Sequence, residues 1–262
     1  MHTQSVQVLY TISGFVIGAL TGMTGSGGGA LMTPMLIIAF GIHPVAAVGT
    51  DLVYAALTNA SGTIAHAQNR TIDWRVAGWL ATGSIPMTAI TLVALYYLDI
   101  HGDATQNIVT KILGLALLLT ATSIVFRKQI AQLYARRVGK ISSELVRNLT
   151  ILTGAIIGVL VSVSSVGAGA IGVTALVLLY PEMPMLRVVG SGIAHSVPLT
   201  LIAGLGHWAL GSIDWHLLGS LLLGSIPGIL LGSMVSKRIP EMAVRVTLSG
   251  TLVVICAKFW FF

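Results

Sequence analysis

Long apolar stretches alternate with short polar connections along the whole chain. A helix rises 1.5 Å per residue and needs about 20 mostly apolar residues to cross a bilayer, and stretches of about that size recur from end to end. They are continuous, whereas membrane β-strands would be alternating segments of about ten residues. The pattern therefore predicts an all-α polytopic membrane protein. The predicted segments are 5–22, 29–41, 45–67, 75–98, 108–126, 149–163, 168–180, 186–207, 216–235 and 243–261.

Two of these segments, 29–41 and 168–180, are too short to cross a bilayer as helices. Each follows a glycine-rich run, so we expect each to form a bent or re-entrant hairpin with the segment before it. The sequence therefore predicts about eight transmembrane helices plus two short re-entrant or broken-helix segments.

The two halves of the chain match each other, with rare Trp, His and Pro residues in register. Agreement of this length indicates a duplication. Each half holds five segments, an odd number, so the two copies enter the membrane from opposite faces and form two inverted repeats. At an offset of 140 residues, 14–18 aligns with 154–158 and 24–30 with 164–170; at an offset of 141, His66 aligns with His207, 73–74 with 214–215 and 83–86 with 224–227.

Composition and charge set the environment and the orientation. Hydrophobic residues make up 55% of the 262 residues and charged residues 8%, against about a quarter charged in a soluble domain. The connection 127–148 holds six Lys and Arg against one acid, which predicts a cytoplasmic location and periplasmic termini. The expected organisation is an N-terminal membrane repeat, 1–126, the basic cytoplasmic connection, 127–148, and a C-terminal membrane repeat, 149–262.

Two glycine turns are the first candidate for a substrate site. Glycine lets the chain turn where other residues would clash, and irregular backbone at membrane depth must be buried in protein or line a watery space. The free N–H groups that begin the following half-helix favour an anion, although close helix packing would also select small residues. The candidates are Thr24, Gly25, Ser26, Gly27, Gly28 and Gly29 in the first turn and Ser164, Ser165, Gly167 and Gly169 in the second.

Asp51 is an acid inside the third segment, away from its ends. A carboxylate there costs about a few kcal/mol or more, which makes it a functional candidate. We expect Asp51 to be protonated when the anion is bound and so to couple transport to a proton; a structural hydrogen bond is the alternative. Gly192 stands at the matching position, so the role is asymmetric. Tyr54 and Asn59 are expected to line the same helix face as substrate-binding residues.

Three histidines are further candidates. His66 and His207 occupy equivalent helix ends, where they either anchor the helices at the membrane interface or gate the path. His195 lies deeper, close to Pro198. It either lines the substrate path or has a structural role, and the sequence does not favour one of the two.

Several other functions are not indicated. The single cysteine, Cys256, has no partner for a disulfide, and no metal-ligand cluster or cofactor motif is visible. The net charge of +6 comes from short connections, as membrane orientation requires, rather than from a nucleic-acid surface. The glycine turn lacks the Lys and Ser or Thr of a phosphate-binding loop, and no motif for nucleotide drive is present.

Several motifs together resemble the sulfite exporter TauE/SafE family, the four-spanner-repeat sulfonate uptake and export permeases. They are the glycine turn, 48–50, the two Asp-Trp pairs, 193–200 and 204–207. The resemblance covers nearly the whole chain and implies a bacterial inner-membrane permease for small anions, commonly sulfite, sulfoacetate or related sulfur compounds.

The leading prediction is a secondary transporter, not an enzyme, that moves a small sulfur oxyanion or organosulfonate and is coupled to protons. An intramembrane enzyme and a passive anion channel remain the alternatives. The expected partners are a small anionic substrate and the lipid bilayer, with no nucleic acid; oligomeric state is left open.

Overall fold

The computed structural model describes residues 2–24, 29–98, 102–137, 142–235, 250 and 254–255, and all regular structure in these ranges is helical. The all-helical prediction is confirmed for this part of the chain. The helices are α1 (His2–Thr24), α2 (Gly29–Phe40), α3 (Pro44–Gln68), α4 (Trp74–Tyr97), α5 (Asp103–Arg137), α6 (Ser143–Ser164), α7 (Ala170–Leu179), α8 (Met185–Ala209) and α9 (Trp215–Val235).

Nine of the ten predicted segments coincide with these helices, and most of the tenth, 243–261, lies outside the described residues. The connection 127–148 contains more helix than its polarity suggested. α5 continues to Arg137 because Arg, Lys, Gln, Ala and Leu are good helix formers after the apolar stretch ends. α6 begins at Ser143, where the Ser142 hydroxyl accepts a hydrogen bond from the Leu145 N–H.

Four described helices are long and apolar enough to cross a membrane: α4, α5 as far as Phe126, α6 and α8. The chain is therefore a multi-pass membrane protein. α3 is also 25 residues long, but Asp51, Asn59 and His66 lower its hydropathy. The apolar parts of α1, α2, α7 and α9 are shorter, so the count of eight spans stays a prediction.

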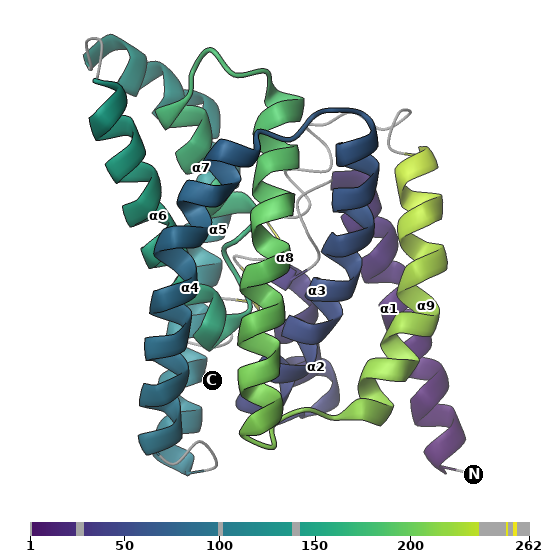
Figure 1. Ribbon diagram of the computed structural model, residues 1–262. Helices are drawn as coiled ribbons and strands as arrows, with labels where there is room; N and C mark the ends of the chain where they lie inside the picture. The colour runs from purple at the N-terminus through teal and green to yellow at the C-terminus, as the bar shows by residue number, and fades with distance from the viewer. Residues whose placement is uncertain are drawn as a thin grey trace.

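The helices pack mainly as three pairs, each with one member from each half of the chain. α1 packs along α9 and α4 packs along α6, while α3 and α8 pack together and lie between those two pairs (Figure 1). The residues at the centre of the molecule are therefore carried by α3 and α8, and by the short helices α2 and α7 that pack beside them.

Glycines bring the two helix backbones into contact within the α1–α9 pair and within the α4–α6 pair, and the contacts are alike in the two pairs. A Cβ atom added at any of four of them would collide with the backbone of the partner helix; such contacts of small residues are typical of membrane helix interfaces. The partner positions are themselves equivalent at the offset of 141. The contacts are Gly14 with Leu221 and Gly18 with Ser225 between α1 and α9, and Gly154 with Leu80 and Gly158 with Ser84 between α4 and α6.

The substitution Gly158→Ala is expected to destabilise the protein. The new Cβ would lie 2.5 Å from the Ser84 carbonyl oxygen, so α4 and α6 must separate, at a cost of about 1–3 kcal/mol. Thermal unfolding in detergent should show a lower Tm. Gly78→Ala in α4 is the matched control, because no atom lies within 4 Å of its added Cβ, and it should leave the Tm unchanged or slightly higher. Equal Tm values for the two variants would contradict the tight contact.

Candidate functional site

The second glycine turn is a break between two helices inside the protein. α6 ends at Ser164, and Ser165 follows in the left-handed region with φ 56°. Gly167 has φ 115°, a conformation that favours glycine, and Gly169 precedes the first residue of α7. Ser165 and Gly167 are buried, so the irregular backbone at this point is enclosed by protein, as a membrane chain requires.

Only the two end residues of the first glycine turn, Thr24 and Gly29, lie within the described part of the chain. Gly25, Ser26, Gly27 and Gly28 lie outside the described residues. α1 ends at Thr24 and α2 begins at Gly29, which are the equivalents of Ser164 and Gly169. The helix ends on both sides of the turn therefore match those of the second turn, and the role of the intervening residues stays a prediction.

The two serines of the second turn differ in their contacts. The Ser164 hydroxyl donates to the Leu160 carbonyl at 2.6 Å and accepts the Val166 N–H at 3.2 Å, so it stabilises the end of α6. The Ser165 hydroxyl is buried and has no hydrogen-bond partner among the described residues. The Ser165 side chain instead lies beside the Asp51 carboxyl group.

Asp51 lies in the first half of α3, about two turns from its start, and is fully buried. The Thr33 hydroxyl of α2 donates to Asp51 Oδ2 at 2.5 Å, while Oδ1 has no partner in the described part of the chain. The side chain of Ser165 is its neighbour from the second glycine turn. The fold thus brings an acid of the N-terminal half to the turn of the C-terminal half.

Tyr54 and His195 occupy equivalent positions in α3 and α8, and both are buried. His195 Nε2 lies 2.8 Å from the hydroxyl oxygen of Ser84 in α4. Ser225, the equivalent of Ser84, lies beside Tyr54, but the Tyr54 hydroxyl makes no hydrogen bond to a described residue. Asn59 is half-buried farther along α3. The two equivalent positions therefore face equivalent serines, and only His195 lies within hydrogen-bond distance of its serine.

His66 and His207 lie in matching hydrogen-bonded corners at the ends of α3 and α8. His66 Nδ1 is 2.8 Å from Thr71 Oγ1, and His207 Nδ1 is 3.0 Å from Ser212 Oγ. His207 is buried, and its Nε2 also lies 2.9 Å from the Ser162 carbonyl oxygen, whereas His66 is half-buried. Both rings hold helix ends in place, and a gating role stays a prediction.

The chain beyond each corner reaches across to the other half. The Asp73 N–H donates to Ser191 Oγ at 2.8 Å, and the Asp214 N–H donates to Thr50 Oγ1 at 3.1 Å. Ser191 and Thr50 are equivalent residues of α8 and α3. The same hydrogen bond is therefore made twice, once in each direction between the halves.

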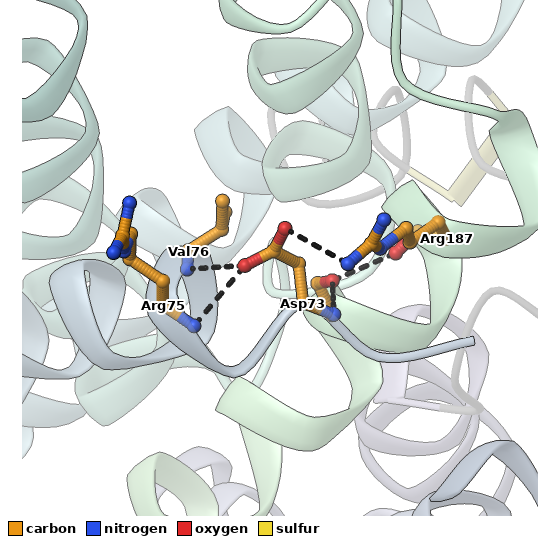
Figure 2. Close-up of polar contacts among 5 residues, drawn as sticks. Asp73, Arg75, Val76 and Arg187 are labelled. Atoms are coloured by element: carbon orange, nitrogen blue, oxygen red, sulfur yellow. Dashed lines mark hydrogen bonds and ion pairs between the residues drawn. The ribbon is translucent and has the colours of Figure 1, made fainter. Parts of the chain in front are cut away.

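An ion pair distinguishes the two corners. Asp73 Oδ1 accepts the N–H groups of Arg75 and Val76 at the start of α4, and Asp73 Oδ2 lies 3.4 Å from Arg187 Nη2 (Figure 2). Ala46 stands at the position equivalent to Arg187, so the pair is one-sided. Because the Arg187 side chain is half-exposed, its contribution to stability is small.

Sequence reasoning missed two buried polar residues that contact the candidate site residues: Thr33, which contacts Asp51, and Ser84, which contacts His195. Each is a small polar side chain in an apolar segment, which alone carries little information. For Ser84 a signal lay in the duplication, because Ser84 aligns with Ser225 at the offset of 141. Thr33 had no such signal.

The known proteins that this chain resembles are all described as exporters or probable membrane transporters. A family model described as "Sulfite exporter TauE/SafE" matches residues 10–259. The chain is similar to "Probable membrane transporter protein YjnA" of Bacillus subtilis, with 36% identity over 218 residues that cover 83% of this chain and 85% of the relative. It is also similar to "Probable membrane transporter protein MJ0441" of Methanocaldococcus jannaschii, with 28% identity over 205 residues that cover 75% and 70% of the two chains. No solved structure matches.

Proposed function

Because this chain belongs to the sulfite exporter TauE/SafE family, we propose that it is a secondary transporter that moves a small sulfur oxyanion or organosulfonate across the bacterial inner membrane. The family and the names of the relatives indicate a membrane transporter. The sulfur anion is proposed from the family description. The absence of a nucleotide-binding motif from the sequence favours drive by an ion gradient.

The burial of the Asp51 carboxyl group is the observation on which the proposed mechanism rests. This group is fully buried and has one oxygen without a partner among the described residues. An ionised carboxylate at membrane depth is costly and would repel an anion nearby, and protonation removes both costs. We therefore assign proton coupling to Asp51, with the anion bound while Asp51 is neutral.

The proposed substrate site lies between the two glycine turns. The buried hydroxyls of Ser165 and Tyr54 support it, because hydroxyl groups can donate hydrogen bonds to an oxyanion. Inclusion of 24–29, Asn59 and His195 in this site, and gating by His66 and His207, belong to the same proposal.

The proposed architecture is two inverted repeats with about eight transmembrane helices and two short re-entrant or broken-helix segments. The contacts that recur at the offset of 141, including the glycine contacts and the two reciprocal Asp N–H bonds, support a two-fold relation between the halves. Transporters built in this way bind substrate near the midplane between the repeats.

Proteoliposomes containing the purified protein test the function. We expect uptake of sulfite or a small sulfonate, with accumulation when the outside is more acidic than the inside. Uptake that only equilibrates the anion, with the same rate at every pH gradient, would instead favour a passive channel. Failure to move any of the small anions would refute the proposed function.

The topology gives a separate prediction. Alkaline phosphatase is active only in the periplasm, so a fusion at the C-terminus should be active and a fusion at Ala135 inactive, since the basic connection is expected to be cytoplasmic. Enzyme activity in whole cells, normalised to fusion-protein abundance, is the measurement. The opposite pattern would reverse the proposed orientation.

A further inference from the structure

The end of α6 leaves a buried backbone carbonyl group that its own helix does not pair. In a continuing helix the Ser162 carbonyl would accept the N–H of Val166, four residues later. The Val166 N–H instead donates to the Ser164 hydroxyl oxygen at 3.2 Å, because the helix ends at Ser164 and the chain turns at Ser165. Ser162 is fully buried, so its carbonyl oxygen needs a donor from another part of the protein.

His207 supplies this donor from the last turn of α8. Its Nε2 lies 2.9 Å from the Ser162 carbonyl oxygen, and the ring is buried. A carbonyl oxygen can only accept a hydrogen bond, so Nε2 carries a hydrogen atom. The other ring nitrogen, Nδ1, lies 3.0 Å from Ser212 Oγ. His207 therefore caps the end of α6 in the way that basic side chains cap helix C-termini, although it comes from a different helix.

His207 also lies against α3, in the half of the chain that carries Asp51. A Cβ atom added at Gly49 would lie 3.1 Å from His207 Cβ and 2.8 Å from the Ser212 carbonyl oxygen, so the absence of a side chain at this position permits the close approach. The next residue, Thr50, accepts the Asp214 N–H at 3.1 Å. The corner that holds the His207 ring is thus packed on α3 and bonded to it.

Both contacts of His207 are close in sequence to the residues of the proposed mechanism. Asp51 follows Gly49 by two residues, and Ser165 follows Ser162 by three. The Ser165 side chain lies beside the Asp51 carboxyl group. The two chain segments that meet at Asp51 are therefore both held by one histidine.

The equivalent corner in the other half has no acid beside it. A Cβ atom added at Gly190 would lie 2.9 Å from His66 Nδ1, so His66 packs on α8 as His207 packs on α3. Gly192 follows Gly190 by two residues, where α3 carries Asp51. Of the two histidine corners, only that of His207 adjoins the proposed proton-coupling residue.

We propose that His207 is a positioning residue for transport, which holds Ser165 against Asp51 by capping α6 at Ser162 and packing on α3. The inference rests on the proposed function and goes beyond the gating role given to His207 there, because the residue acts through the second glycine turn. When the cap is lost, the Ser165 hydroxyl is no longer held where the anion requires it. The consequence is weaker anion binding, with the maximal rate retained.

The test separates the two nitrogen contacts of the ring by measuring proteoliposome uptake of sulfite and methanesulfonate. Asparagine places its amide group near the position of Nδ1, so His207→Asn cannot reach Ser162 and should raise the KM of the transported anion about tenfold. Glutamine places its amide group near the position of Nε2 and can still donate to the Ser162 carbonyl. His207→Gln should therefore have a KM close to that of the native protein.

The KM distinguishes positioning from a purely structural role, because both substitutions replace the buried ring and both should lower the Tm. His216→Asn is the control, since His216 is exposed near the start of α9, and its KM should not change. A native KM for His207→Asn would overturn the inference. A tenfold higher KM for folded His207→Gln protein would do the same, and this measurement does not require His207→Asn to fold.

A double-mutant cycle tests whether His207 acts through Ser165. In Ser165→Ala protein the hydroxyl to be positioned is already absent, so adding His207→Asn should raise the KM much less than it does in the native background. An equal rise in the two backgrounds would overturn the inference alone. Absence of uptake by the native protein would instead refute the proposed function, and the inference with it.

Discussion

Asp51→Asn protein is expected to exchange the anion across the membrane without responding to a pH gradient. Asparagine has the shape of a protonated aspartate, and its amide oxygen can still accept the hydrogen bond that Thr33 donates to Asp51. It cannot release a proton. The proposed proton and anion would move in the same direction through the native protein, so an outside-acid gradient should drive the anion into vesicles only when Asp51 is present.

The expected effect on anion accumulation is large, and its size follows from the pH gradient. One proton coupled across one pH unit supplies about 1.4 kcal/mol, which corresponds to tenfold accumulation at equilibrium. The native protein should approach that ratio, and Asp51→Asn should remain near equal concentrations. Asp103→Asn is the control, because Asp103 is exposed in the first turn of α5. If Asp51→Asn accumulates the anion like the native protein, Asp51 is structural and the coupling residue must be sought at His195 or His66.

Gly167→Leu should abolish transport. Gly167 is buried with φ 115°, where a side chain is strained by about 1–3 kcal/mol, and its added Cβ would lie 3.2 Å from Ile171 Cδ1. A bulky side chain therefore distorts the turn that carries Ser165. Gly28→Leu, in the first turn and outside the described residues, is expected to have the same result.

Membrane insertion should survive both substitutions, because leucine raises hydropathy. Uptake per membrane-inserted protein is the quantity to measure, and it should fall below about 1% of the native rate if about 3 kcal/mol of strain falls on the transporting state. Gly78→Leu is the control, since Gly78 is exposed and its Cβ direction is open. Full transport by well-inserted Gly167→Leu protein would assign the turn to packing alone.

The helices were predictable from the sequence because a membrane helix must be apolar over a fixed length. The predicted segment 75–98 and the observed α4, Trp74–Tyr97, differ by one residue at each end, since Asp73 caps the start of the helix. α5 was predicted to end at residue 126 but continues to Arg137. Hydropathy marks where an apolar stretch ends, whereas a helix ends only where backbone hydrogen bonding ends.

The candidate site was less predictable because its contacts join separate elements. Asp51 was identified from its position in an apolar segment, and the structure shows that it is fully buried. Its neighbours Thr33 and Ser165 come from α2 and from the turn after α6, and no periodicity within α3 specifies them. The duplication gave more information than hydropathy did, because it aligned Asp51 with Gly192 before any contact was known.

The contact between α1 and α9 also has a consequence for synthesis of the protein. Gly14 packs on Leu221, so about 200 residues separate the partners, and a ribosome that adds about 5–20 residues per second needs roughly 10–40 s to supply the second one. During that time α1 resides in the bilayer with its glycines against lipid or against the insertion machinery. α4 and α6 are close in sequence and can pack together early. The nascent chain is therefore expected to assemble from its middle outward, with α1 among the last helices to pack against its partner.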